Sequence, residues 1–148
     1  MINSVTVLQI LITKGSAVWS IPPDENTYRA LEIMAEKDIG ALLVVKDDQV
    51  VGLFSERDYA RKVILKGKHA KEISVSEIMT KDVISIPPDT TTFNTLELMT
   101  NKRVRHLPVL EDGKLLGLIS IGDVVLAIIN ELKASVKQLE QYISSGGG

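Results

Sequence analysis

The sequence contains no cysteine and only two histidines, His69 and His106, among its 148 residues. Without cysteine the chain has no disulfide bond, no thiolate nucleophile and no zinc site with cysteine ligands. No apolar run approaches the roughly 18 residues that a membrane-spanning helix needs. The first residues also lack the basic start, apolar stretch and cleavage site of a signal peptide. We therefore expect a cytoplasmic protein that does not enter a membrane.

The sequence also lacks a large excess of either positive or negative charge. The formal net charge is −2 and the pI is near 5.7. A nucleic-acid-binding surface would need an excess of basic residues, so nucleic acid is not an expected partner. The length supports one compact domain or two very small ones.

The residue patterns of common catalytic sites are missing as well. The sequence shows no paired nucleophile and base, no cluster of metal ligands and no glycine-rich phosphate loop of the Walker type. We expect no catalytic residue and no metal site. A binding function is therefore favoured over an enzymatic one.

What the chain does contain is an internal repeat. Val18-Trp-Ser-Ile-Pro-Pro-Asp24 returns 65 residues later as Val83-Ile-Ser-Ile-Pro-Pro-Asp89. The alignment of residues 18–64 with 83–129 has no gap and gives 19 identities over 47 positions. Two copies of one supersecondary unit predict two related halves, each of which would be marginally stable alone.

Both copies predict the same order of elements, β-α-β-β-α. A short apolar run ends at the Pro-Pro pair, because proline has no backbone donor for strand pairing. Asp24 and Asp89 then stand where a helix N-cap belongs, ahead of apolar residues at helical spacing. Two further apolar runs follow, joined by a tight polar turn, and a second helix starts from Ser55 and from Ser120. The predicted strands are Val18–Ile21, Leu42–Val45, Val50–Phe54, Val83–Ile86, Leu107–Leu110 and Leu115–Ile119.

These elements predict an α+β fold in which the two copies share one core with pseudo-two-fold symmetry. Each copy has a short helical leader that opens on a hydroxyl N-cap, Thr6–Ile12 and Ser76–Met79. The predicted division is residues 5–66 for the first copy with its leader, 67–75 for a linker and 76–132 for the second copy with its leader. Residues 133–148 are predicted to form a helical extension and a disordered tail.

This order of elements and its motifs resemble the CBS domain, and two in tandem resemble a Bateman module. The resemblance covers residues 5–132 and rests on several motifs, two of which recur in both copies at the fixed offset. In particular, the chain is similar to the small stand-alone CBS-pair proteins. The motifs are Ile-Pro-Pro-Asp-x-x-Thr before each first helix, His106-Leu-Pro-Val109, Gly52-Leu-Phe-Ser-Glu-Arg-Asp58, Gly117-Leu-Ile-Ser-Ile-Gly-Asp123 and Ile78-Met-Thr80.

The functional interpretation concentrates on Ser-x-x-Asp at the end of the last strand in each copy. The first amides of a helix and its dipole favour a phosphate, and a serine hydroxyl there can add a hydrogen bond. A carboxylate one turn on can accept hydrogen bonds from two ribose hydroxyls. The resemblance assigns these roles to Ser55 with Asp58 and to Ser120 with Asp123. The same spacing also fits an N-terminal capping box, and both interpretations can hold.

Basic residues near these turns would neutralise phosphate charge. Arg57 and Arg61 are four residues apart and share a helix face, which fits a phosphate contact or a solvated surface. Arg105 and His106 precede Leu-Pro-Val, where the related modules place phosphate-facing basic residues. Because Gly40 occupies the position equivalent to Arg105, we expect the Ser120–Asp123 site to bind nucleotide better. The resemblance adds three apolar residues to this site: Val83, Leu107 and Pro108.

The last predicted helix carries an apolar stripe that continues past the repeat. Its spacing of four and three residues is that of a short coiled-coil seam. A second copy of the chain is the expected partner, so we expect a homodimer. The stripe consists of Val125, Ile129, Leu132, Val136, Leu139 and Ile143.

The resemblance implies a regulatory module that senses an adenosine-containing ligand and modulates an unidentified partner protein. AMP is favoured, and ADP, ATP, NAD(H) and S-adenosylmethionine stay open because all share the adenosine. One alternative is a structural or adaptor protein with no physiological ligand. A nucleotide-hydrolysing enzyme is the other.

Overall fold

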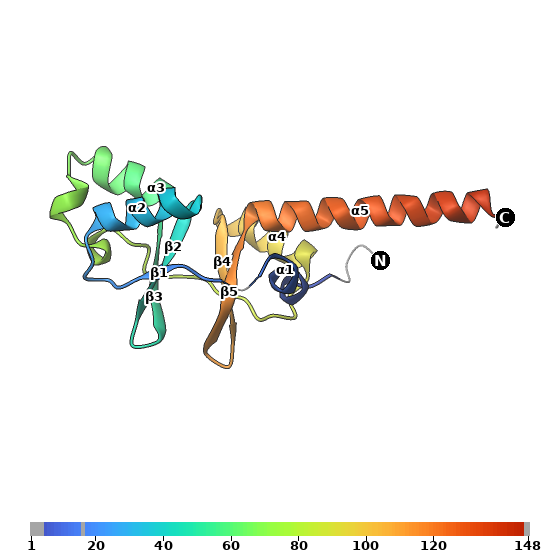
Figure 1. The fold of residues 1–148 in the computed structure, drawn as a ribbon, viewed down its shortest axis with the longest axis horizontal. Helices are drawn as coiled ribbons and strands as arrows, with labels where there is room; N and C mark the ends of the chain where they lie inside the picture. The colour runs from blue at the N-terminus through green and yellow to red at the C-terminus, as the bar shows by residue number, and fades with distance from the viewer. Residues whose placement is uncertain (1–4, 16, 147–148) are drawn as a thin grey trace. The chain divides into compact units, whose positions relative to one another are not determined.

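The computed structural model describes residues 5–15 and 17–146 and has a mixed α and β architecture. It divides into two compact units, drawn in Figure 1. The first-repeat unit comprises residues 17–84, and the second-repeat unit comprises residues 1–16 with 85–148. Each leader therefore packs with the other copy, whereas the sequence division at 5–66 and 76–132 grouped it with the copy that it precedes. The predicted disordered tail includes residues 147 and 148, which lie outside the described residues.

The first-repeat unit is built on a three-stranded sheet with the order β1-β2-β3. β1 pairs in parallel with β2, which pairs antiparallel with β3. A π-helical segment continues α3, and two short 3₁₀ helices follow. The elements are β1 (Ser20–Ile21), α2 (Thr27–Lys37), β2 (Ala41–Lys46), β3 (Gln49–Ser55), α3 (Glu56–Asp58), η1 (Tyr59–Ile64), η2 (Ala70–Glu72) and η3 (Val75–Glu77).

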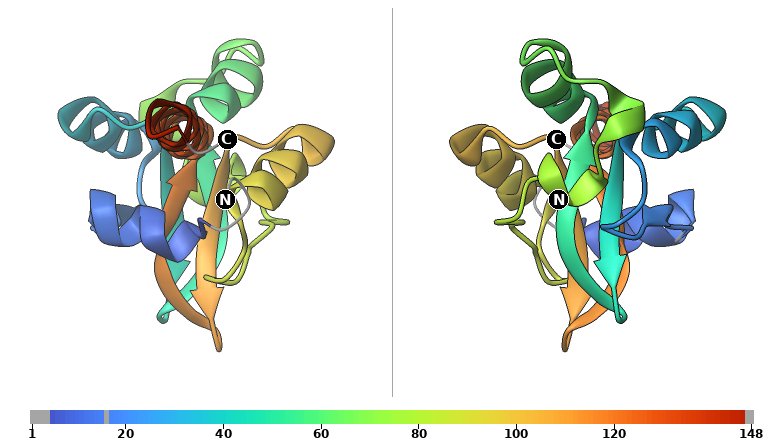
Figure 2. Two further views of the ribbon diagram at one scale, coloured as in Figure 1. Left: turned by 90° about the vertical axis from the view of Figure 1, so that its right-hand side faces the viewer. Right: turned by 90° about the vertical axis from the view of Figure 1, so that its left-hand side faces the viewer.

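The second-repeat unit is built on an antiparallel pair of strands, β4 and β5. In the left view of Figure 2, α1 and α4 lie on opposite sides of this hairpin. Of the predicted strand Val83–Ile86, whose residues the structure describes, only Ile86 forms a β-bridge, in parallel with Val109. The elements are α1 (Val7–Lys14), α4 (Thr92–Lys102), β4 (His106–Glu111), β5 (Lys114–Ser120) and α5 (Ile121–Ser144).

The 65-residue offset of the sequence repeat reappears in the backbone. Each hairpin has a register irregularity at the same place, between Val44 and Val45 and between Val109 and Leu110. Each two-residue turn has positive φ at both positions, 51° and 61° at Asp47–Asp48 and 51° and 78° at Asp112–Gly113. That geometry defines a type I′ turn, whose twist matches that of the flanking strands.

The predicted N-caps Asp24 and Asp89 are wrong by two residues. Each lies in a turn that the Pro-Pro pair starts, in which Glu25 N–H donates to Pro22 O at 3.2 Å and Thr90 N–H donates to Pro87 O at 3.2 Å. Because of this turn, each helix begins two residues later than predicted. The true N-caps are Asn26 for α2 and Thr91 for α4, whose side chains accept from Tyr28 N–H and Asn94 N–H.

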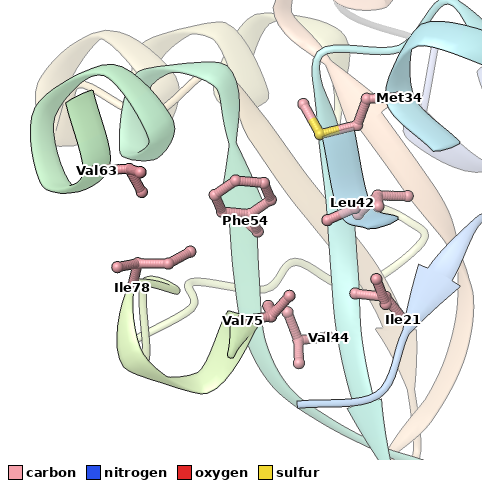
Figure 3. Packing of buried hydrophobic residues seen from close by; sticks show 9 residues of the cluster. Ile21, Met34, Leu42, Val44, Phe54, Val63, Val75 and Ile78 are labelled. Atoms are coloured by element: carbon pink, nitrogen blue, oxygen red, sulfur yellow. The ribbon is translucent and has the colours of Figure 1, made fainter. Parts of the chain in front are cut away.

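The leaders are held by close packing against a glycine in the last strand of the unit that they join. A Cβ on Gly52 would lie 2.5 Å from Met79 Sδ, and a Cβ on Gly117 would lie 2.5 Å from Leu11 Cδ2. A larger residue at either position would force the Met79 or Leu11 side chain to move. Figure 3 shows the second leader's Val75 and Ile78 inside the buried core of the first-repeat unit, beside Phe54.

The second leader begins earlier than predicted. Its 3₁₀ helix is capped by Ser74, with Ser74 N–H donating to Glu77 Oε2 at 2.7 Å, so Ser76 is not the N-cap. The N-cap of the first leader is as predicted, and its helix runs to Lys14, past the predicted end at Ile12. Thr6 caps α1 in a reciprocal box with Gln9.

Candidate functional site

Ser120 ends β5 and caps α5, as the sequence predicted. Asp123 N–H donates to Ser120 Oγ at 3.1 Å, and Ser120 N–H donates to Asp123 Oδ2 at 2.9 Å. This is a complete capping box, so the interpretation of the motif as a helix cap is confirmed. It fixes a hydroxyl and a carboxylate side by side at the positive end of a helix of 24 residues.

The Asp123 carboxylate also binds a cation from the leader. Lys14, the last residue of α1, donates from Nζ to Asp123 Oδ2 at 2.7 Å and to Leu118 O at 3.1 Å. Burial alone would raise the pKa of Asp123. The hydrogen bonds from Lys14 and Ser120, with the charge of Lys14, outweigh burial and lower that pKa below its usual value. The carboxylate is therefore ionised at neutral pH.

The basic pair predicted for this site does lie beside it. His106 opens β4 directly opposite Ser120 in the strand register, and Arg105 O accepts from Ile121 N–H at 2.9 Å. Leu107 and Pro108 follow within β4 and are buried. These residues and the capped turn all belong to the second-repeat unit.

Val83 is the remaining residue predicted for this site. It lies in the first-repeat unit, and its N–H donates to Lys81 O at 3.0 Å.

A groove of about 440 Å³ begins at Asp123 and follows the space between α1 and α5. The Lys14–Asp123 ion pair lies in its wall, and Glu131 lines it farther along α5. Glu131 is buried, and its Oε1 accepts from Thr92 Oγ1 at 2.7 Å. Aliphatic and amide side chains form most of the remaining wall: Val5, Gln9, Ile10, Thr13, Leu126, Ala127, Asn130, Ala134, Ser135 and Gln138.

The Ser55–Asp58 turn has the same capping box but a more crowded carboxylate. Asp58 Oδ2 accepts from Ser55 N–H at 3.0 Å and from Ser55 Oγ at 3.1 Å. Asp58 Oδ1 accepts from Lys62 Nζ at 2.9 Å and from Thr80 Oγ1 at 3.1 Å. Both oxygens are therefore engaged within the unit, and the side chain is only 10% exposed.

Arg57 and Arg61 follow this turn, but not on one regular α-helix. Arg57 lies in α3 and is partly buried, whereas Arg61 lies in the π-helical segment η1 and is exposed. The wider turn of a π-helix changes the angle between residues i and i+4. The shared face predicted for the two arginines assumed an uninterrupted α-helix.

Three contacting residues were not assigned to the site from the sequence: Lys14, Lys62 and Thr80. The spacing of Lys62 from Asp58, four residues on a helix, is the signal that predicts an ion pair. Lys14 gave no such signal, because it is 109 residues from Asp123 in the chain.

The described ranges 5–15 and 17–146 contain neither a metal-binding cluster nor a membrane-spanning helix. Among these residues no three His, Asp or Glu side chains are grouped so that they could hold a metal ion. Within the same residues no helix has both the length and the apolar character needed to cross a membrane.

Comparison with known proteins identifies the family. The family model described as CBS domain matches residues 11–65 and 75–130. The chain belongs to the CBS-domain family and carries two CBS domains in tandem, the arrangement of a regulatory CBS-pair module.

Individual relatives agree with this assignment. The CBS domain-containing protein CBSX3, mitochondrial, of Arabidopsis thaliana is 35% identical over 154 residues, which cover 97% of this chain and 74% of the relative. A solved protein with CBS domains from Burkholderia ambifaria is 47% identical with a TM-score of 0.82, covering 85% of this chain and 95% of that one. The chain therefore resembles the small CBS-pair proteins, as the sequence motifs predicted.

A more distant neighbour shares the fold and was solved with ligands. The CBS domain pair of protein MJ0100 is 21% identical with a TM-score of 0.76, covering 86% of this chain and 98% of that one. Its structure is a complex with 5′-methylthioadenosine and S-adenosyl-L-methionine.

Proposed function

We propose that this chain is a regulatory module that binds an adenosine-containing ligand at the Ser120–Asp123 turn. The observation that carries the proposal is the Asp123 carboxylate. It is ionised, 24% exposed and positioned at the N-terminus of α5, and the contacts from Lys14 and Ser120 all engage Oδ2. Ribose hydroxyls would bind this carboxylate, and the Ser120 hydroxyl and the first amides of α5 would face a phosphate.

The neighbouring residues suit a phosphorylated ligand. Arg105 and His106 flank the capped turn and would supply positive charge, while the buried Leu107 and Pro108 would anchor the strand that positions them. AMP is the favoured ligand, with ATP, NAD and S-adenosylmethionine as the other adenosine compounds to test. The complex of MJ0100 with two adenosine compounds supports this ligand class, because the two proteins share a fold.

The Ser55–Asp58 turn is proposed as the weaker site. Arg57 and Arg61 would be its cationic residues. A ligand there would have to displace Lys62 or Thr80 from Asp58 Oδ1 and Ser55 from Oδ2. At Asp123, by contrast, the leader contact to be displaced is the single one from Lys14.

The proposed role of the module is regulatory. The module would act on a partner protein through ligand occupancy rather than catalyse a reaction itself. We further propose that it is a homodimer and that it is cytoplasmic, although the Arabidopsis relative carries the name mitochondrial.

Thermal unfolding of the intact chain with AMP, ATP, NAD and S-adenosylmethionine tests the proposal. A ligand that binds only the folded state at a hundred times its Kd stabilises it by about 2.7 kcal/mol. We expect a melting shift of several degrees with at least one compound. If none of them shifts the melting temperature at millimolar concentration, the chain is not an adenosine sensor.

A second candidate function is that of an adaptor with no ligand. One observation favours it: the carboxylates at the equivalent position of the two copies already bind a lysine, Asp58 with Lys62 and Asp123 with Lys14. Native mass spectrometry of the purified protein separates the two. A co-purified adenosine compound supports the sensor, and its absence together with a flat thermal screen supports the adaptor.

A further inference from the structure

The C-terminal end of α5 is exposed on all sides. Every residue from Val136 to Gly146 is exposed, and the helix continues beyond residue 130, where the match to the CBS domain ends. Figure 1 shows this part of α5 running past α1 and α4 of its own unit. Short helical segments that bury nothing are marginally stable in water. The extension therefore needs a partner that buries one of its faces.

The face in question is the apolar stripe predicted from the sequence. Its six residues, from Val125 to Ile143, are between 40% and 68% exposed. The unit packs on a different face of α5, where Val124 and Glu131 are buried, and the groove toward α1 lies along Ala127 and Ala134. Among the described residues nothing covers the stripe.

The charges beside the stripe select the occupant and its direction. With the stripe at heptad positions a and d, the e positions beyond residue 130 hold Lys133 and Glu140, both exposed. When two such helices run antiparallel, e positions face e positions of the partner, and Lys133 of each chain meets the partner's Glu140. In a parallel pair e faces g, and the g positions Ile128, Ser135 and Tyr142 carry no charge.

We propose that α5 pairs antiparallel with α5 of a second copy of this chain. Leu132 packs against the partner's Ile143, and Val136 packs against the partner's Leu139. Two symmetric ion pairs join Lys133 to the partner's Glu140. This arrangement rests on the homodimer of the proposed function and adds the surface and direction by which the dimer forms.

Charge reversal tests the pairing. Lys133→Glu or Glu140→Lys replaces two attractive pairs by two repulsive ones and is expected to weaken dimerisation about tenfold. The double variant restores both pairs and is expected to recover wild-type dimerisation, as is a mixture of the two single variants. Lys137→Glu makes the same charge change at an outer b position and serves as the control, with little expected effect. Sedimentation velocity over a concentration series measures wild type and the five other samples.

Disulfide crosslinking tests the direction independently, because the sequence has no cysteine of its own. A mixture of Leu132→Cys and Ile143→Cys is expected to crosslink between the two variants. Neither variant alone is expected to crosslink, because equivalent residues lie about 16 Å apart along the antiparallel pair at 1.5 Å per residue. Crosslinking of each variant with itself would indicate a parallel pair and overturn the proposal.

Three outcomes contradict the pairing without touching nucleotide binding. They are a monomeric wild type, a dimer that no charge variant weakens, and a double variant that fails to recover. Thermal shifts with AMP and the other adenosine compounds are measured on the same samples, since the Ser120 turn lies at the opposite end of α5. An intact antiparallel dimer with no nucleotide shift would refute the sensor and leave the pairing standing.

Discussion

The two Ser-x-x-Asp turns are alike in backbone and different in chemistry. Both form a reciprocal capping box at the end of a strand. Asp58 receives its lysine from its own helix, four residues on, whereas Asp123 receives its lysine from the leader α1. The two copies therefore share the helix cap, which depends only on residues three apart. They differ in the lysine that binds each carboxylate.

The two carboxylates bind different lysines because the two copies differ at one position of the helix. The residue equivalent to Lys62 in the second copy is Ala127, so α5 cannot supply its own cation. Lys14 supplies it instead from a separate helix. A contact from a separate helix can be released by a small movement of that helix, whereas a contact within one helix turn stays in place. The comparison therefore favours Asp123 as the carboxylate that can exchange a lysine for a ligand.

The largest expected effect is on ligand affinity. Asp123→Ala removes the acceptor of two ribose hydroxyls and is expected to weaken binding by on the order of 2–4 kcal/mol, allowing for partial compensation by water. Asp58→Ala is expected to weaken binding less. Calorimetric titration of both variants with the adenosine compound found in the thermal screen measures the ratio. If Asp58→Ala is the more damaging change, the main site belongs to the first repeat.

The loss of folding stability is expected to be larger for Asp58→Ala than for Asp123→Ala, the reverse of the order expected for ligand affinity. Asp58 is buried, and Asp58→Ala would leave Lys62, Thr80 and the Ser55 amide without their acceptor. The free energy of unfolding should fall by about 2–3 kcal/mol, as for loss of one partner of a buried charged network. Asp123→Ala should cost about 1 kcal/mol, since its carboxylate and Lys14 are more exposed. Urea unfolding without ligand compares the two, and equal losses would contradict the contrast between the turns.

The sequence predicted those parts of this site that are held by local interactions. The capping boxes at Ser55 and Ser120 involve residues three apart, and the strands and type I′ turns follow from apolar runs and turn residues. The Lys14–Asp123 contact could not be read from any spacing, because it depends on the leader packing against Gly117 of the other copy. The N-caps were missed for a different reason. The Pro-Pro-Asp segment favours a turn as well as a cap, and the turn occupies the residues before Asn26 and Thr91.

A smaller effect is expected when the leader contact is removed. If Lys14 and ribose compete for Asp123, Lys14→Ala should tighten the binding of adenosine roughly fivefold, the value of about one surface ion pair. Adenosine is the probe because it has no phosphate for Lys14 to bind. Lys114→Ala, at an exposed position in β5 outside both turns, is the matched control and should leave this affinity unchanged. Weaker binding of adenosine by Lys14→Ala would show that Lys14 supports the ligand instead of excluding it.

The smallest expected effect is the contribution of Asp123 to the pH dependence of stability. Its pKa is lower in the folded chain than its usual value of 3.8, because the bonds from Lys14 and Ser120 outweigh burial. A lowered pKa means that the unfolded chain binds the proton more readily than the folded chain. The stabilisation is therefore fully present above the unfolded pKa and is lost as the pH falls through the folded one. Wild type and Asp123→Asn should differ in free energy of unfolding near pH 6, and the difference should shrink below about pH 4. Lys14→Ala should reduce this pH dependence in part, since Ser120 still donates to the carboxylate. A difference between wild type and Asp123→Asn that stays constant down to the acid transition would show that the Lys14 contact does not persist in solution.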